Sequence, residues 1–600
     1  MRRLIALIFT IASSSVISSA QTVAEMEYIM RFHGETDPEE MDSYEVERLS
    51  ELLTRPVMIN LSTASRLTSS GLFTRYQVAS LIDYRMRHGD VLSYSELEAL
   101  DGFGGDFVER VAPFISLYSP RLPGERADTL LSVSCDVAVR SGFKFDVDES
   151  PKWNYAVKGR TEAGERIYAS IASSRSASAE GSSPDSWSGA LAWSFKKLPA
   201  RIMIGDYNAR FGQGLALWNG MTMSGLSTPS AFIKSASGLS RSWSFTGNTS
   251  FTGIASDIIM KHVSVSAMVA FPGIKDLDAF PYDVTLLPAL NMVWHGSNGQ
   301  IGLTHYAEFT GLQGPENLRI PDMKTASDVS YCLNGVDVSS EIVYDWVNNS
   351  IAGIGAVRFP VGENVRLASM LRFYPPLYDP GKGGAARAGS KCTNEYGAAV
   401  SGQFSAGEWI SIRGAQGFGS SVRRHSGTFS IDAAYFPVPK DNSDISIQIK
   451  ALALWEMMLT DALRIKVRLS ERIRSWGHPF RTDFRLDLMW QSSILEFTAR
   501  VNALKCMGLG LVSYAEGGYR GDRLSFFLRA GIYAVDNWDD RIYVYERDAP
   551  GSFNVPALYG RGTWASATAS WRFSRWGRVY FRASKKPGKA ELKIQGVFSF

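Results

Sequence analysis

The chain has few of the residues that build metal centres and disulfide scaffolds. Its four cysteines, Cys135, Cys332, Cys392 and Cys506, lie far apart without a CxxC pair, and its seven histidines include no HExxH motif. These spacings predict no resident metal and no cofactor. One or two disulfides can form after export, and isolated thiols fit the spacing equally well.

Long hydrophobic runs are also missing. Beyond residue 20 no stretch reaches the roughly 18 apolar residues that a membrane-spanning helix needs. Hydrophobic residues still make up 45% of the chain and aromatic residues 12%. Many aromatics beside modest hydropathy are typical of a barrel whose strands turn one face to water, although a secreted all-β protein has similar statistics.

The first 20 residues have the pattern of an export signal. Met1-Arg2-Arg3 is positively charged, residues 4–12 are apolar except Thr10, and Ser18-Ser19-Ala20 supplies small residues for cleavage. This pattern predicts a secretory signal peptide over residues 1–20. No cysteine follows the expected cleavage site, which argues against a lipid anchor.

From about Thr129 onward, apolar and polar residues alternate. Because a strand rotates its side chains by half a turn per residue, alternation gives each strand one apolar and one polar face. We expect the charged residues of such strands to line a wet lumen. The clearest runs place Leu463, Ile465, Val467 and Leu469 between Arg464, Lys466 and Arg468, and Phe484, Leu486 and Leu488 between Asp483, Arg485 and Asp487.

This tract, residues 119–600, is predicted to form a large antiparallel transmembrane β-barrel. At roughly 20 residues per strand and turn it holds roughly 22 to 26 strands, and closure pairs every backbone amide. A β-solenoid or propeller is the alternative, but no fixed repeat appears. The last strand alternates and ends in Phe598 and Phe600. We expect this strand to be the one that the barrel-assembly machinery engages.

Residues 21–118 differ from the rest in charge and pattern. They contain 17 acidic and 8 basic residues, a net charge of −9, so the remaining mature chain is basic. We predict an acidic helical segment over residues 21–56, with one helix over about 37–54. Residues 57–118 predict four further helices, with a cap at Ser62 or Thr63 and a capping box over Ser93–Glu96.

The segment from 57 to 118 resembles a tandem helix-hairpin-helix domain of the kind found in competence-type DNA-uptake receptors. The resemblance is strongest at Ile59-Asn60, residues 82–85, Gly89 and the turn that follows Asp101. In such domains the glycines of the turn let backbone amides approach DNA phosphates. The residues that the resemblance implies for phosphate binding are Gly102, Phe103, Gly104 and Gly105, with Arg75, Arg85 and Arg87 as a local basic patch.

Two features argue against strong DNA binding. The first hairpin, Gly71-Leu72-Phe73-Thr74, lacks the paired glycines, and the charges from residue 53 to 118 sum to −1. Non-specific duplex binding depends on phosphate neutralisation, so such a domain binds weakly at physiological salt. A structural or protein-docking role for the same fold is the favoured alternative.

Residues 205–218, within the barrel tract, break the alternation with closely spaced glycines. With this segment, nearly the whole chain resembles a family of Gram-negative outer-membrane proteins that join a periplasmic helix-hairpin-helix domain to a long barrel and carry a similar segment. The segment is interpreted either as a strand end with a glycine bend or as a contact point for a plug or for the periplasmic domain. Its family residues are Gly205, Asp206, Tyr207, Phe211, Gly212, Gln213, Gly214 and Trp218.

Catalytic signatures are not evident. His262, His295 and His305 are candidates for a rim site of the protease or phospholipase kind, but no GxSxG or metal motif accompanies them. We therefore predict a non-enzymatic outer-membrane barrel whose periplasmic domain serves as a plug or as a docking module for periplasmic or outer-membrane proteins. A DNA-uptake protein is the alternative, and a diffusive porin is a weaker third idea.

Overall fold

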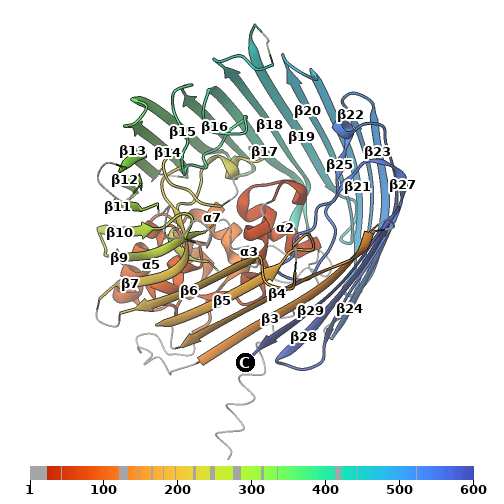
Figure 1. Cartoon of the computed structure of the whole chain (residues 1–600), viewed down its shortest axis with the longest axis horizontal. Coiled ribbons are helices and arrows are strands. Elements are labelled where there is room, and N and C mark those ends of the chain that lie inside the picture. Colours follow the sequence, from red (N-terminus) through yellow and green to blue (C-terminus); the bar gives the residue numbers. More distant parts are fainter. Residues whose placement is uncertain are drawn as a thin grey trace, which may run out of the picture.

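The computed structural model describes residues 23–41, 43–119, 133–146, 149–163, 166–179, 181–195, 198–220, 225–242, 250–274, 285–311, 317–333, 335–411, 421–441, 444–521 and 523–600. The predicted signal peptide, residues 1–20, lies outside these residues. Within the described part of the chain, 24 antiparallel strands close into one barrel, as the sequence predicts (Figure 1). None of the helices described is long and apolar enough to cross a membrane.

The wall strands follow one another around the barrel in chain order. They are β3 (Val133–Asp146), β4 (Glu149–Ala163), β5 (Ile167–Arg175), β6 (Ser186–Ser194), β7 (Ala200–Arg210), β9 (Phe251–Ile259), β10 (Val263–Ala270), β11 (Leu287–His295), β12 (Gly299–Thr310), β13 (Arg319–Leu333), β14 (Val336–Asp345), β15 (Ser350–Val361), β16 (Val365–Tyr374), β17 (Glu395–Ser411), β18 (Ser421–Phe436), β19 (Ser446–Met458), β20 (Leu463–Arg474), β21 (Phe480–Gln491), β22 (Leu495–Lys505), β23 (Leu509–Arg520), β24 (Leu524–Val535), β27 (Gly560–Arg572), β28 (Gly577–Lys586) and β29 (Lys589–Ser599).

The last strand closes the ring against the first. β29 pairs antiparallel with β3, and the amides of Cys135 and Phe600 each donate to the other's carbonyl at 3.1 and 2.9 Å. Phe598 and Phe600 both stack on Trp576. We call the end of the barrel where residues 133 and 600 meet the terminal end, and the other the opposite end.

The wall alternates as the sequence predicts. Along β11, Ala289, Asn291 and Val293 are buried on the inner side, while Leu290, Met292 and Trp294 are about half exposed on the outer side. Large apolar side chains face outward in this way around the ring. An apolar exterior on a closed sheet is the surface that a lipid bilayer requires. The four cysteines are all unpaired.

The N-terminal residues form a helical domain that lies inside the ring of strands (Figure 1). A parallel pair of short strands, β1 with β2, joins the two ends of its second part. Its elements are α2 (Val23–His33), η1 (Pro38–Glu40), α3 (Ser43–Thr54), β1 (Val57–Met58), α4 (Ala64–Ser69), α5 (Arg75–His88), α6 (Tyr94–Glu98), α7 (Gly104–Val111), η2 (Ala112–Phe114) and β2 (Ile115–Ser116).

Local capping explains most of these helix starts. Thr63 caps α4, and Thr74 with Gln77 forms a capping box on α5. Ser93 caps α6, but the Glu96 carboxylate accepts from the amide of Leu92, one residue before the position that a complete capping box uses. The predicted single helix over 37–54 is wrong at its start, because Pro38 begins a separate 3-10 turn and α3 starts only at Ser43.

Long connections at the opposite end fold inward and add a second layer. Residues 211–220 and 225–237 belong to one of them, which carries η3 (Pro229–Phe232) and returns through β8 (Gly238–Arg241), which pairs with β7. Residues 375–394 pack on this segment, with the Trp218 amide donating to the Lys382 carbonyl at 3.0 Å. Residues 536–559 carry η5 (Trp538–Asp540), β25 (Ile542–Tyr543) and β26 (Ala557–Leu558).

Candidate functional site

The tip of the helical domain is a short turn that presents carboxylates to the barrel wall. Pro38 opens the 3-10 helix η1 and keeps Asp37 extended (φ −128°), and the carboxylates of Asp37, Glu39 and Glu40 point toward arginines of the wall. Gly34 precedes the turn at φ +79°, and a Cβ there would lie 2.5 Å from the amide nitrogen of Ala231. A side chain at this position is therefore excluded twice, by conformation and by space.

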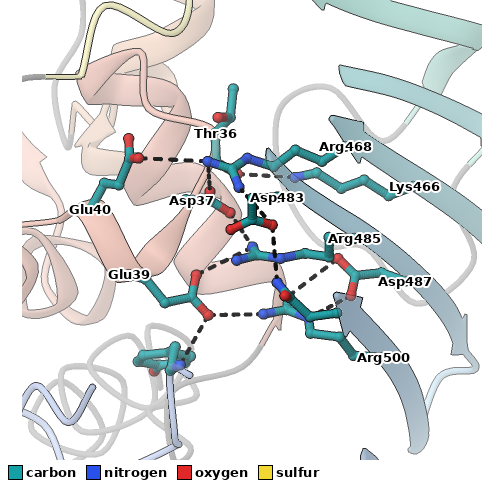
Figure 2. A network of polar contacts seen from close by, with 12 residues as sticks. Thr36, Asp37, Glu39, Glu40, Lys466, Arg468, Asp483, Arg485, Asp487 and Arg500 are labelled. Atoms are coloured by element: carbon teal, nitrogen blue, oxygen red, sulfur yellow. Dashed lines mark hydrogen bonds and ion pairs between the residues drawn. The ribbon is translucent and has the colours of Figure 1, made fainter. Parts of the chain in front are cut away.

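Three arginines from adjacent strands receive these carboxylates (Figure 2). Asp37 pairs with Arg468 of β20 at 2.8 Å and with Arg485 of β21. Glu39 pairs with Arg500 of β22 at 2.8 Å and with Arg485 at 3.4 Å, and it also accepts from the amide of Tyr545 at 3.0 Å. We call this group the tip network.

Strand register places two positive charges of the wall opposite each other, and a carboxylate of the helical domain lies between them. Arg468 and Arg485 are direct cross-strand partners, an arrangement in which like charges repel. Asp37 lies between the two guanidinium groups, and its side chain is only 3% exposed. Lys466, on the same face, donates to the backbone carbonyl of Thr36 at 3.1 Å. The wall thus recognises both the carboxylate and the peptide backbone of the tip.

The surroundings decide the ionisation of these acids. Burial raises the pKa of Asp37, but Arg468 and Arg485 outweigh burial and hold that pKa below its ordinary value. The pKa of Glu39 is lowered in the same way, with burial opposed by Arg485 and Arg500. Both carboxyl groups are therefore ionised at neutral pH, and the network is a contact between full charges.

Further contacts hold the domain around the circumference. They join its helices to strands β3, β4, β7, β10, β15, β16 and β20 and to the turn after β9. The pairs are Arg55–Asp136, Glu47–Lys158, Glu51–Arg160, Arg66–Glu162, Glu45–Arg210, Asp83–Lys261, Arg75–Ser266, Asp106–Arg358, Asp106–Arg366 and Glu27–Arg464. The mainly acidic domain therefore meets a mainly basic lumen.

The residues predicted to line the lumen split into two groups. Arg464, Lys466, Arg468 and Arg485 all contact the helical domain. Asp487 instead pairs with Arg500 at 2.5 Å, and Asp483 lies 3.7 Å from Arg468. Sequence reasoning missed their partners Asp37 and Glu39, and also Tyr545, whose amide donates to Glu39. Only the acidic count of residues 21–118 signalled two of these, and nothing signalled Tyr545.

The residues proposed for DNA phosphates do not form one patch. Arg75 is 4% exposed and donates to Ser266 and Asn291 of the wall, and burial lowers its pKa to about 10. Arg85 donates to the carbonyl of Ser62, and Arg87 pairs with Asp83. At 1.5 Å per residue, Arg75 and Arg87 are about 18 Å apart along α5.

The glycine turn before α7 has the expected backbone. Gly102 and Gly104 have φ of +82° and +67°, and Phe103 packs with Phe73 and Phe107 in the domain core. Nothing lies within 4 Å of a Cβ built on Gly104, and Gly105 faces the Glu98 carboxylate. The turn is therefore open on one side. Asp106 in the first turn of α7 already meets Arg358 and Arg366.

The glycine-rich segment after β7 turns into the lumen and encloses a buried carboxylate. Glu341 of β14 accepts from the amides of Gln213, Leu215 and Ala216 at 2.7, 2.9 and 3.1 Å. Gly212 has φ +57°, and a Cβ there would lie 2.8 Å from the Glu341 carboxyl group. No feature of the sequence indicated Glu341.

Other members of this segment join neighbouring structures. Asp206 accepts from the amide of Gly189 and from Thr252, and Tyr207 and Phe211 are buried. A Cβ on Gly205 or Gly214 would meet the Gly189 carbonyl at 2.1 Å or Trp218 at 3.2 Å. The strand end before the segment contacts the domain, since Arg210 pairs with Glu45 at 2.5 Å.

One serine–histidine pair lies on the inner wall. Ser264 and His295 Nε2 are 2.7 Å apart, and Tyr76 of the domain stacks on the imidazole. His295 Nδ1 has no hydrogen-bond partner among the described residues, so the third member of a catalytic triad is missing there. His305 contacts Thr325 instead. Among the described residues, no group of three or more His, Cys, Asp or Glu could hold a metal ion.

Comparison with known proteins gives structural matches only. No family model matches the chain, and no curated protein matches it. The P pilus usher (PapC) translocation pore aligns with 9% identity and a TM-score of 0.36, over 78% of this chain and 99% of that one. The siderophore receptor PirA from Pseudomonas aeruginosa aligns with 9% identity and a TM-score of 0.40, over 79% of this chain and 81% of that one. An E. coli P pilus tip assembly intermediate, PapC-PapD-PapK-PapG, aligns with 10% identity and a TM-score of 0.47, over 80% of this chain and 62% of that one.

The wall itself decides the class of protein. Its closed sheet of 24 strands has an even strand number, an apolar exterior and a polar interior. Closed antiparallel barrels of this construction belong to outer membranes. The protein is an outer-membrane β-barrel.

Proposed function

We propose that the helical domain is a plug and that the protein is a non-enzymatic outer-membrane barrel whose lumen this plug closes. The observation that carries the proposal is the tip network, in which Asp37 and Glu39 fill an arginine cluster on the wall. The plug also contacts strands around the ring, through Glu47 on β4 and Asp106 on β15 and β16. A domain held on several sides blocks passage until these contacts break.

Connection lengths support a periplasmic origin for the plug. At the terminal end they run from two residues (334–335) to nine (412–420), whereas the opposite end carries 211–250, 375–394 and 536–559. Outer-membrane barrels have short periplasmic turns and longer extracellular loops. The plug touches two of the short turns, where Asp83 meets Lys261 and Tyr76 donates to the carbonyl of Ser297 at 2.6 Å. We infer that the plug enters and leaves from the periplasm.

A disulfide lock tests the plug. Ser65 of α4 and Ser194 of β6 have side-chain oxygens 2.7 Å apart, so cysteines at both positions are placed to bond. With the four native cysteines replaced by serine, the oxidised double variant is expected to show no current in planar bilayers, and reductant is expected to restore occasional openings. Each single-cysteine variant is the control. Steady conductance of the oxidised form would disprove a plug.

Binding of duplex DNA is the second candidate, and the open glycine turn favours it. Gly102 and Gly104 adopt the positive φ that lets backbone amides approach phosphates, and space beside Gly104 is free. Against it, Asp106 lies at the start of the same helix and Arg75 faces the wall. The test is a gel shift with the full-length protein. Binding at about 150 mM salt that Gly104→Glu abolishes would support this function.

A further inference from the structure

The basic face of β20 and β21 continues beyond the plug. Arg472 and Arg474 of β20 and Arg481 of β21 lie on the same inner face as Arg468 and Arg485, farther toward the opposite end. From Arg464 to Arg474 the row spans ten residues, or about 33 Å at 3.3 Å per residue. The row therefore extends along most of one strand, and the plug covers only its first part.

The uncovered part repeats the arrangement of the covered part, but no carboxylate of the described residues bridges its arginines. Arg472 and Arg481 are direct cross-strand partners, as Arg468 and Arg485 are. Among the described residues no carboxylate lies within ion-pair distance of either, and the Nε of Arg472 is buried without a hydrogen-bond partner. Arg474 donates to Gln448 at 2.6 Å, and Asp539 pairs with His478. Two facing guanidinium groups without a counter-ion are unfavourable unless a ligand supplies one.

The covered part shows which ligand this wall accepts. Residues 36–40 bind it through side-chain carboxylates and through the carbonyl of Thr36, which accepts from Lys466 at 3.1 Å (Figure 2). A carbonyl contact of this kind recognises a polypeptide, whereas a phosphate chain would use the arginines alone. We propose that the inner face of β20 and β21 is a binding track for an acidic peptide segment, with Arg472, Arg474 and Arg481 as its entry site.

This proposal rests on the plug function in one respect. The entry site is free while the plug is in place, but the rest of the track is free only when the plug has left. A peptide that entered from the opposite end would meet Arg474 and Arg481 first and then compete with Asp37 for Arg468 and Arg485. The track therefore names a class of cargo or partner for the plugged barrel.

The entry site is tested with the plug locked. The protein carries the oxidised Ser65→Cys/Ser194→Cys bond, and the probe is a fluorescent peptide with the sequence of residues 34–41, followed by its anisotropy. We expect binding that weakens as salt rises and falls about tenfold in Arg472→Gln/Arg481→Gln. Arg541→Gln/Arg561→Gln is the matched control, because Arg561 is exposed, Arg541 is half-buried and both belong to the same end. Normal heat-modifiable gel mobility shows that each variant is folded.

Three results would overturn the proposal. One is equal binding of the same peptide with Asp and Glu replaced by Asn and Gln. Another is unchanged affinity in Arg472→Gln/Arg481→Gln. The third is binding of inorganic tripolyphosphate without binding of the peptide, which would assign the site to phosphate. Because the plug is locked throughout, failure of the plug function appears in the bilayer currents and leaves this measurement interpretable.

Discussion

Replacing Asp37 by Asn removes the carboxylate that bridges Arg468 and Arg485. At 2.8 Å and an effective dielectric constant of about 20, the gross attraction to Arg468 is about 6 kcal/mol. Removing one partner of a buried pair typically destabilises by about 3–5 kcal/mol. Arg485 keeps Glu39 at 3.4 Å and Arg468 keeps Glu40 at 3.6 Å, which favours the lower figure. A change of about 3 kcal/mol raises the fraction of unplugged barrels about a hundredfold.

Chemical labelling measures that fraction. Ser266 on the inner wall is 2% exposed beneath Arg75, so a cysteine placed there reacts with a maleimide only when the plug has moved. If the plug returns faster than the reagent reacts, the labelling rate follows the unplugged fraction. We expect Ser266→Cys to label about a hundredfold faster when Asp37→Asn is added.

The matched control removes a carboxylate of similar chemistry from an exposed place. Glu408 is 74% exposed and pairs with Arg424 at 3.2 Å, so Glu408→Gln should change the rate less than about fivefold. An unchanged labelling rate in Asp37→Asn, in protein with normal heat-modifiable mobility, would refute the reasoning. It would mean that the arginine pair tolerates its own repulsion and that the tip does not hold the plug.

Three further outcomes follow from the same contacts. Gly212→Ala forces a Cβ to 2.8 Å from the Glu341 carboxyl at φ +57°, and should lower stability by about 1–3 kcal/mol, seen as a lower temperature for loss of the compact gel band. Burial and Glu40 raise the pKa of Glu35 well above its ordinary value, so the ionised carboxylate destabilises the seated plug. Glu35→Gln should therefore slow labelling of Ser266→Cys at pH 7.5. This difference in labelling rate should vanish in acid, where Glu35 is protonated. Because the pKa values of Asp37 and Glu39 are lowered, their stabilisation of the seated plug is complete above about pH 5 and is lost as the pH falls further. Openings in planar bilayers should therefore become more frequent as the pH is lowered from about 5 to about 2.

Local patterns in the sequence were enough to predict the strands of the barrel wall and the faces that they turn inward. The alternation over residues 463–470 predicts which side chains face inward, because the period of a strand is a property of neighbouring residues. Helix starts at Thr63 and Ser93 follow from caps of the same short range. The break at Pro38 was missed because the acidic and apolar residues around it continue a helical pattern, while the proline and the contact of Asp37 with the wall end it.

The partners of these residues could not be predicted in the same way. More than 400 positions separate Asp37 from Arg468, and 125 or more separate Glu341 from the loop amides that donate hydrogen bonds to it. No periodicity connects residues across such distances, since only closure of the barrel brings them together. The charge asymmetry was the one long-range signal. A net charge of −9 on residues 21–118 beside a basic remainder has its counterpart in an acidic plug within a basic lumen.

Plug release and anion binding are then two sides of one equilibrium. Arg468 and Arg485 accept either Asp37 or an outside carboxylate, but not both in the same place. A peptide that binds this pair only in the unplugged state promotes release of the plug. By linkage, it does so by the same factor by which the plug lowers the affinity of the barrel for the peptide. An acidic segment that reaches Arg468 and Arg485 can therefore open the barrel without any contact to the plug's helices, and its effect should disappear in Arg485→Gln even though that variant is itself less firmly plugged.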